Sequence, residues 1–137
     1  MSNQPFPNDR PAHDPYAAAP QPLTPTEERT WATIGHVVPL AATVLSAGTL
    51  GFVGSLVVYL LYKDRGPFVR AHTANSLNVQ ITTGIVLLIS LPLMLVGIGF
   101  LTYGLAILVA VVLHAIGASR ANAGQWWEPP FTLRFVR

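Results

Sequence analysis

Residues 71–119 of the chain read AHTANSLNVQITTGIVLLISLPLMLVGIGFLTYGLAILVAVVLHAIGAS, and none of these 49 side chains is charged. One straight helix of this length would measure about 73 Å, more than twice the roughly 30 Å of hydrocarbon in a bilayer. The stretch must therefore turn once. The two glycines in 96–99 (Val-Gly-Ile-Gly) favour a turn there, which predicts helices near 72–95 and 100–121, the first kinked near its end by Pro92.

A second charge-free stretch, residues 31–62, comes earlier in the chain. A single helix over this stretch would measure about 48 Å, which is too long for one comfortable span, and the stretch is short for two full ones. The residues at 46–51 (Ser-Ala-Gly-Thr-Leu-Gly) favour a tight turn, which predicts helices near 31–46 and 50–62. One long tilted helix is the alternative and would give three spans in all.

The composition makes lipid the favoured solvent for these helices. Hydrophobic residues make up 51% of the 137 residues and charged residues only 10%, against about 25% charged in soluble domains. The mean hydropathy is +0.46. We therefore predict an all-α protein, a polytopic membrane bundle of four helices arranged as two hairpins within residues 26–137.

The first 25 residues are expected to lie outside this membrane domain. They hold seven prolines and lack the apolar core of a signal peptide, which predicts a disordered tail. Just after it, Thr24 or Thr26 is placed to cap a helix whose first turn holds Glu27 and Glu28. The tail either only solubilises the chain or docks a proline-reading partner.

The charged segment 63–70 sets the predicted topology. Its three basic residues against one acid mark a cytoplasmic loop, and both hairpin turns are uncharged. We expect all open ends, including both termini, on the cytoplasmic side of the cell membrane, with an extended segment at 125–137 lying along its surface. The predicted lipid-headgroup contacts are Lys63, Arg65, Arg70, Arg120, Arg134 and Arg137, and the predicted interfacial anchors are Trp31, Trp126 and Trp127.

Polar side chains gather at the start of the predicted third helix, where an apolar span makes each of them costly. The candidate stripe consists of His72, Asn75, Asn78, Gln80 and Thr82. All but Gln80 fall within about 120° of one another at about 100° per residue. Two interpretations stay open: a polar cavity that binds a headgroup, ion or peptide, and hydrogen bonds between helices that fix their order.

Two more histidines, His36 and His114, are expected at a similar depth on the same side. A metal site with His72 would need three rings to converge without a nearby carboxylate to orient them, so we predict no metal and no cofactor. The sequence holds no cysteine, and its six acids (Asp9, Asp14, Glu27, Glu28, Asp64 and Glu128) lie outside the spans. Without a nucleophile–base pair or a phosphate loop, we expect a protein that is not an enzyme.

Two motifs resemble those of a known family. The first runs from 67–72 (Pro-Phe-Val-Arg-Ala-His) into 75–82 (Asn-Ser-Leu-Asn-Val-Gln-Ile-Thr), with Val79 where the family usually has an aromatic residue, and the second ends the chain at 127–136 (Trp-Glu-Pro-Pro-Phe-Thr-Leu-Arg-Phe-Val). From about residue 30 onward the chain resembles the domain of unknown function 4870 family (DUF4870), small bacterial multi-span membrane proteins similar to the small membrane subunit of the Tic translocon.

This resemblance implies a bacterial membrane protein without an assigned activity, and its likeness to a translocon is an analogy of fold alone. The leading hypothesis is a non-enzymatic scaffold or accessory subunit whose polar stripe locks the bundle. The alternative is a small channel, transporter or protein-translocation component with a polar path along the third helix. The expected partner is the lipid bilayer, with another membrane protein or a second copy of the chain as an open alternative. The scattered basic residues indicate no nucleic acid.

Overall fold

The chain folds into two helical hairpins of different length. The computed structural model describes residues 20–137, so most of the tail predicted to be disordered lies outside the described residues. Within them there are four α-helices, one 3₁₀ turn and no strand, which confirms the predicted all-α fold of two hairpins. The elements are α1 (Pro25–Leu45), α2 (Gly51–Tyr62), α3 (Pro67–Leu93), η1 (Met94–Val96) and α4 (Ile98–Asn122).

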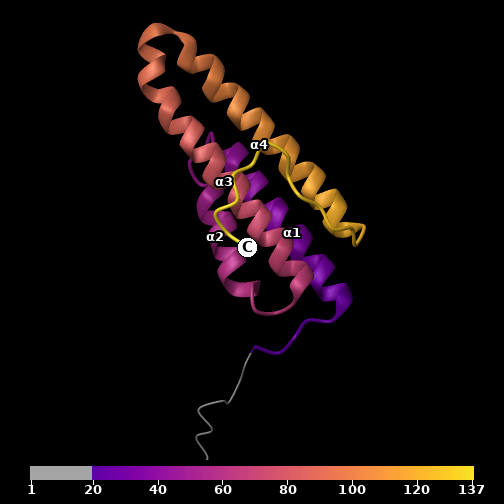
Figure 1. The fold of residues 1–137 in the computed structure, drawn as a ribbon. Coiled ribbons are helices and arrows are strands. Elements are labelled where there is room, and N and C mark those ends of the chain that lie inside the picture. Colours follow the sequence, from indigo (N-terminus) through magenta and orange to yellow (C-terminus); the bar gives the residue numbers. More distant parts are fainter. Residues whose placement is uncertain (1–19) are drawn as a thin grey trace, which may run out of the picture.

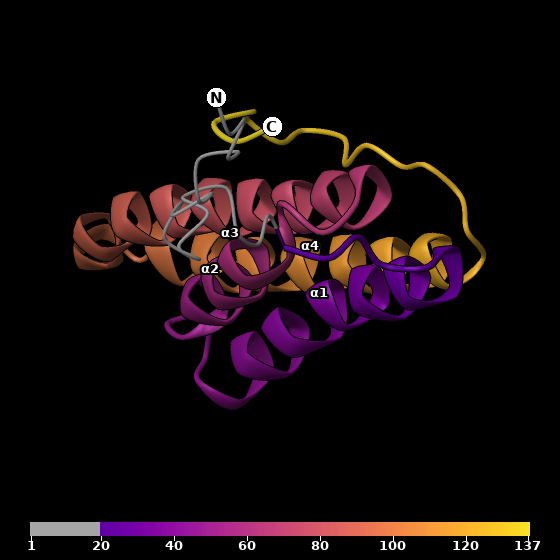
Figure 2. The ribbon, with the colours of Figure 1, turned by 90° about the horizontal axis from the view of Figure 1, so that it is seen from below.

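The α3–α4 hairpin extends beyond the α1–α2 hairpin (Figure 1). α1 packs against α4, α3 and α2, and α2 also packs against α3, so the four helices share one interior. After α4 the chain turns back and runs along α3 without regular secondary structure. Figure 2 shows α1 and α2 on one side of α3 and this last segment on the other. We call residues 125–137 the C-terminal strap.

Both turns form where the sequence predicts them. Between α1 and α2 the backbone takes positive φ at Ala47 and Gly48 (51° and 97°). The Tyr103 hydroxyl on α4 donates a hydrogen bond to the Ala47 carbonyl at 2.8 Å, which ties this turn to the longer hairpin. Between α3 and α4, Gly97 takes the left-handed conformation (φ 83°) that glycine adopts without steric cost.

The start of α1 carries the predicted cap. Glu27 N donates to the Thr24 hydroxyl at 3.3 Å, and Thr24 N donates back to the Glu27 carboxylate at 2.8 Å, which makes a capping box. The backbone and side-chain hydrogen bonds from Thr24 hold the pKa of the Glu27 carboxyl below its ordinary value. α1 therefore begins at Pro25, ahead of the expected start near residue 31.

The start of α3 is capped from a different helix. The Glu28 carboxylate on α1 accepts hydrogen bonds from the backbone N–H groups of Phe68 and Val69, at 2.8 and 3.0 Å. A carboxylate at this end of a helix satisfies orphan N–H donors and suits the helix dipole. Together with Pro67 at the first helical position, this cap starts α3 five residues before the expected start near residue 72.

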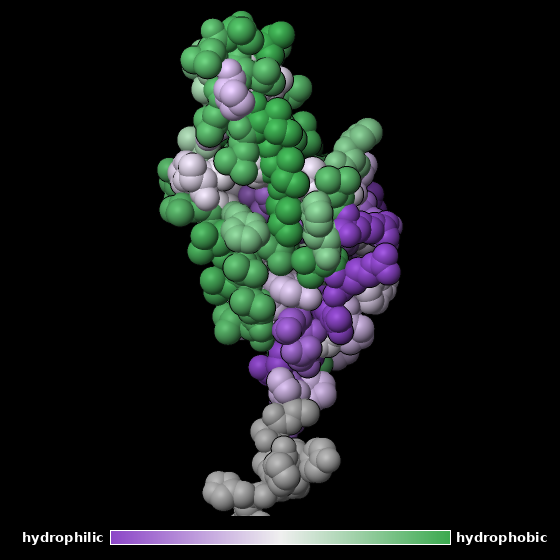
Figure 3. All heavy atoms as spheres, turned by 60° about the vertical axis from the view of Figure 1, so that its left-hand side comes forward, coloured by the Kyte–Doolittle hydropathy of each residue, from purple (hydrophilic) through white to green (hydrophobic). Residues whose placement is uncertain are grey.

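The distribution of polarity is inverted relative to a water-soluble protein. Many large apolar side chains point outward, with Leu95 90% exposed and Leu101 72% exposed, while histidine, asparagine and glutamine side chains are buried in the interior beside a few apolar ones. Figure 3 shows apolar surface over the long hairpin and polar surface gathered at the opposite end. Two segments, Pro67–Val96 and Ile98–Asn122, are long and apolar enough to cross a membrane. Such a surface is stable in lipid and not in water.

Candidate functional site

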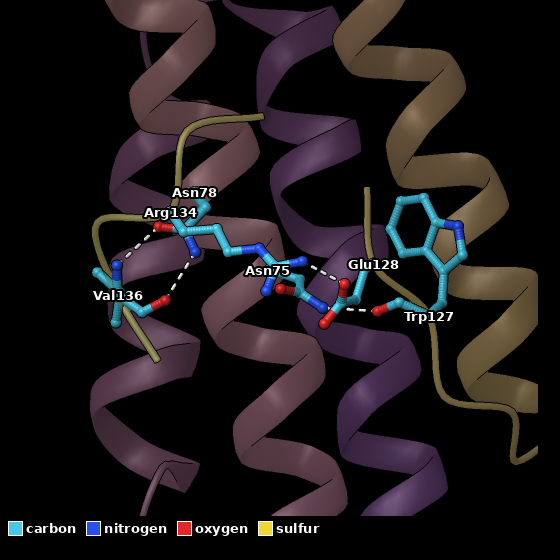
Figure 4. A network of polar contacts seen from close by, with 6 residues as sticks. All are labelled: Asn75, Asn78, Trp127, Glu128, Arg134 and Val136. Atoms are coloured by element: carbon cyan, nitrogen blue, oxygen red, sulfur yellow. Dashed lines mark hydrogen bonds and ion pairs between the residues drawn. The ribbon is translucent and has the colours of Figure 1, made fainter. Parts of the chain in front are cut away.

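One side chain of α3, Asn78, holds the end of the C-terminal strap (Figure 4). Its amide nitrogen donates to the Val136 carbonyl at 2.7 Å, and its amide oxygen accepts from Phe135 N and Val136 N, both at 2.9 Å. Asn78 is buried. Its amide pairs with the strap in the way a neighbouring strand would, so the backbone groups at 135–136 are hydrogen-bonded without a sheet.

Two further stripe residues fasten the strap along α3. The Asn75 amide donates to the Trp127 carbonyl at 2.6 Å (Figure 4). The Thr82 hydroxyl accepts from Leu133 N at 3.1 Å. These three stripe residues pair with the backbone of the chain's own strap, whereas Gln80 and His72 also bond to side chains of other helices. We call Asn75, Asn78 and Thr82 the strap clamp.

Several of the predicted headgroup-binding arginines make contacts within the chain. Arg134 forms an ion pair with Glu128, both in the strap (Figure 4). Arg70 donates to the Arg137 carbonyl at 3.3 Å, and Arg120 to the Gln125 side chain at 2.7 Å. These exposed contacts lie along the edges of the strap. Single ion pairs at such exposed positions contribute little to stability.

The three predicted anchor tryptophans occupy different surroundings. Trp126 is 65% exposed. Trp31 stacks on Tyr62 with ring centroids 4.2 Å apart, which joins α1 to α2. Trp127 instead packs against the buried side chains Val79, Ala110 and Leu113, so the first residues of the strap reach into the bundle.

The remaining polar residues form a buried hydrogen-bonded chain across α3, α4 and α1. Gln80 Nε2 lies 2.7 Å from His114 Nε2, and His114 Nδ1 lies 3.3 Å from His36 Nδ1. His36 Nε2 lies 3.3 Å from His72 Nδ1, and His72 Nε2 lies 3.0 Å from the Gln125 carbonyl of the strap. All three rings are fully buried. We call His36, His72 and His114 the histidine chain.

The two ends of this chain fix where its protons lie. The Gln125 carbonyl can only accept, so His72 carries its proton on Nε2 and accepts at Nδ1 from His36. His36 then accepts at Nδ1 from His114, whose Nε2 accepts from the Gln80 amide. With this assignment each ring is neutral and every hydrogen bond has one donor. The opposite orientation of the Gln80 amide would either leave one buried ring charged or leave two ring nitrogens facing each other without a proton, and both are costly.

The rings come together but do not converge on one point. His36 directs its two nitrogens at two different neighbours, whereas a metal ion needs the ligand nitrogens aimed at a common centre about 2 Å away. Within residues 20–137, no group of three or more histidine and acidic side chains is placed to hold a metal ion. Instead, the three rings form a continuous series of hydrogen bonds from Gln80 to the Gln125 carbonyl.

A glycine on α4 makes room for the histidine chain. A Cβ atom at Gly117 would lie 2.5–2.8 Å from three atoms of the His36 ring. The His36 ring therefore lies directly against the α4 backbone. Sequence reasoning singled out the histidines but neither Gly117 nor the Gln125 carbonyl; the spacing of Gly117 three residues after His114, on one face of a helix, was the available signal.

Residues 27–136 of the chain match the family described as the magnetosome magnetite crystal formation protein family (MamF/MmsF). The match covers most of the chain, including nearly all of the four helices and the strap. The chain belongs to this family. No curated protein and no solved structure shows significant similarity to it. Family membership and the apolar outer surface make the chain a membrane protein.

The suggested resemblance to the DUF4870 family is wrong, because the family that matches is MamF/MmsF. The two motifs behind that resemblance contain the strap clamp of α3 and the strap itself. Polar residues at the start of a helix can pair with an extended C-terminal segment because both need hydrogen-bond partners, and unrelated proteins can share this arrangement. By itself it does not identify a family.

Proposed function

We propose that this MamF/MmsF protein is a non-enzymatic accessory protein of magnetite crystal formation, embedded in the magnetosome membrane of a bacterium. The observation that carries the proposal is the family match over residues 27–136. The strap clamp supports a structural role, because the amides of Asn75 and Asn78 bind the protein's own backbone. The same contacts favour this role over a polar path along the Asn75, Asn78 and Thr82 face of α3, since the strap occupies that face.

The distribution of charge supports an orientation for this protein. Among the described residues, the charged side chains flank the start of α1, the α2–α3 connection, the end of α4 and the strap. The turns at 46–50 and 94–97 hold none. By the positive-inside rule the charged end faces the cytoplasm and the turns face the crystal compartment. Lys63, Arg65 and the other basic residues of this end are then placed beside lipid headgroups.

This orientation predicts the result of two reporter fusions. A fluorescent protein that matures only in the cytoplasm should be bright when fused before residue 1. A reporter active only outside the cytoplasm should be active when inserted at residue 97. Immunoblots of the membrane fraction control for expression of both fusions. A bright cytoplasmic reporter at residue 97 would reverse the proposed topology.

The same orientation indicates that the protein affects the mineral without binding it directly. Iron ions bind carboxylate, imidazole and thiolate ligands. The turn at 94–97 (Met-Leu-Val-Gly) offers no carboxylate or imidazole. We therefore propose that the protein organises other components from its charged end and does not bind the crystal with its turns.

Crystal size in a magnetite-forming cell tests this function. Deleting the gene should change the number or size of crystals seen by electron microscopy, and the wild-type gene should restore them. A double variant of the charged end, Lys63→Gln with Arg65→Gln, should restore them poorly. The matched turn variant, Leu95→Ala with Val96→Ala, should restore them fully at equal protein level. Unchanged crystals after deletion would contradict the proposed function, and the reverse order of the two variants would contradict the proposed mode of action.

A further inference from the structure

The histidine chain has a property that holding helices together does not require. Each inner link of the chain is an imidazole, which accepts a proton at one nitrogen and releases one from the other. No amide or hydroxyl group interrupts the three rings. We propose that the histidine chain transfers protons through the bundle, between Gln80 and the C-terminal strap.

The transfer is balanced at every step. A hydronium ion that enters past Gln80 gives a proton to His114 Nε2, in place of the hydrogen bond from Gln80, and His114 passes the proton on its Nδ1 to His36 Nδ1. His36 then passes the proton on Nε2 to His72 Nδ1, and His72 releases its Nε2 proton to water beside Gln125. Each step forms one N–H bond and breaks another. One proton moves across, and the three rings are left in the opposite tautomers.

The two ends of the histidine chain have different surroundings. Beside the α1–α2 turn, Gln80 borders a pocket of about 330 Å³ whose walls are mainly apolar, with Thr49 and Tyr103 as its other side chains that carry a hydroxyl. A proton entering at this end must therefore pass Gln80 to reach His114. At the other end, Gln125 is exposed on the charged end of the bundle. Between the ends, Phe68 and Trp127 lie beside the rings and shield them.

The geometry also predicts a slow rate. The rings must return to their starting tautomers before a second proton can follow the same route. His36 has to turn for this, yet its ring is fully buried against Gly117. We therefore expect single-proton transfer at rates far below those of an open channel, without leakage of larger ions.

Proton flux into vesicles tests the proposal. The purified full-length protein is reconstituted into liposomes that hold a pH-sensitive dye, and a potassium gradient with valinomycin drives protons inward. Wild-type vesicles should acidify faster than protein-free vesicles. His36→Gln keeps a donor and an acceptor but cannot relay a proton, so its flux should fall to the protein-free rate. The control Ser90→Ala also removes a hydrogen bond between helices, the one to Thr102, and should keep wild-type flux.

Two outcomes of the flux experiment overturn the proposal: wild-type flux no greater than that of empty vesicles, and wild-type flux in a folded His36→Gln variant. Circular dichroism and the elution volume in detergent show whether that variant has folded. If it has not, nitrogen-15 NMR of histidine in the wild-type protein decides. The resting chain requires the proton on Nδ1 of His114 and on Nε2 of His36 and His72, and one transfer leaves all three reversed, so any pattern other than these two contradicts it.

The proposal does not depend on the proposed role in mineral formation, because the flux is measured without iron. The two are chemically compatible. Forming an iron oxide from hydrated iron ions releases protons, and a path that removes them from the crystal compartment would favour growth. A protein that conducts protons but leaves crystals unchanged would refute the proposed function alone.

Discussion

Replacing Gly117 with alanine should lower the free energy of unfolding by about 1–3 kcal/mol, the usual cost of overpacking a core. The added Cβ would lie 2.5 Å from His36 Cε1, 2.6 Å from Nδ1 and 2.8 Å from Nε2. The ring cannot retreat easily, since it is fully buried and both its nitrogens are hydrogen-bonded to other rings. Either His36 shifts and breaks the histidine chain, or α4 moves away from α1.

A glycine on the same helix provides the matched control. A Cβ at Gly104 would have no atom within 4 Å other than its own helix and chain neighbours. Gly104→Ala should therefore leave stability unchanged or raise it by up to about 1 kcal/mol, the intrinsic helix preference of alanine over glycine. Thermal unfolding in detergent, followed by circular dichroism, measures both variants. Equal melting temperatures for Gly117→Ala and Gly104→Ala would show that the ring is not held as described.

The two turns could be predicted because they depend on two local features, the length of each charge-free stretch and the position of its glycines. The length of a charge-free stretch compared with the thickness of a bilayer requires one turn in residues 71–119, and glycine at 97 supplies the φ value the turn needs. The helix starts were less predictable. The cap on α3 comes from Glu28, some 40 residues earlier in the chain, and no local pattern announces it.

Which side chains meet in the interior depends on how each helix is rotated, and polarity alone does not determine this. The three histidines were expected at a similar depth, yet only close packing brings their rings together. Gly35 is one reason: a Cβ there would lie 2.8 Å from a methyl group of Thr73, so α1 approaches α3 closely. Gly117 does the same for α4. Small residues set the rotation, and many combinations of them are possible in one sequence.

The polar stripe on α3 could be predicted from the sequence, but the segment that pairs with Asn75 and Asn78 could not. Both interpretations drawn from the sequence placed water, a ligand or another helix against Asn75 and Asn78. The actual partner is the backbone of residues 125–137, whose carbonyl and N–H groups have no side-chain signature. A physical signal did exist. An extended ending beside a membrane needs hydrogen-bond partners, and an unexplained row of amides can supply them.

Replacing Asn78 with leucine should release the end of the strap. The change removes three hydrogen bonds to Phe135 and Val136, each with a net contribution of about 0.5–1.5 kcal/mol. Even at the lower value, the three bonds together contribute about 1.5 kcal/mol, which corresponds to about a tenfold change in the open population, because 1.4 kcal/mol is a factor of ten. Trypsin cleavage after Arg134, which follows the population of the open strap, should therefore be at least about tenfold faster.

Variants of two other asparagines on the same hairpin serve as comparisons for Asn78→Leu. Asn75→Leu removes one hydrogen bond to the strap, at Trp127, and should give a smaller increase in cleavage. Asn122→Leu makes the same chemical change at an exposed position at the end of α4 and should cleave at the wild-type rate. Cleavage after Lys63 and Arg65, which unlike Arg70 form no hydrogen bond with the strap, reports on opening elsewhere in each sample. The order Asn78, Asn75, Asn122 follows from counting backbone bonds alone. Equal cleavage rates for all three variants would mean that the strap is held by its exposed ion pair and aromatic contacts. The strap clamp would then not hold the strap.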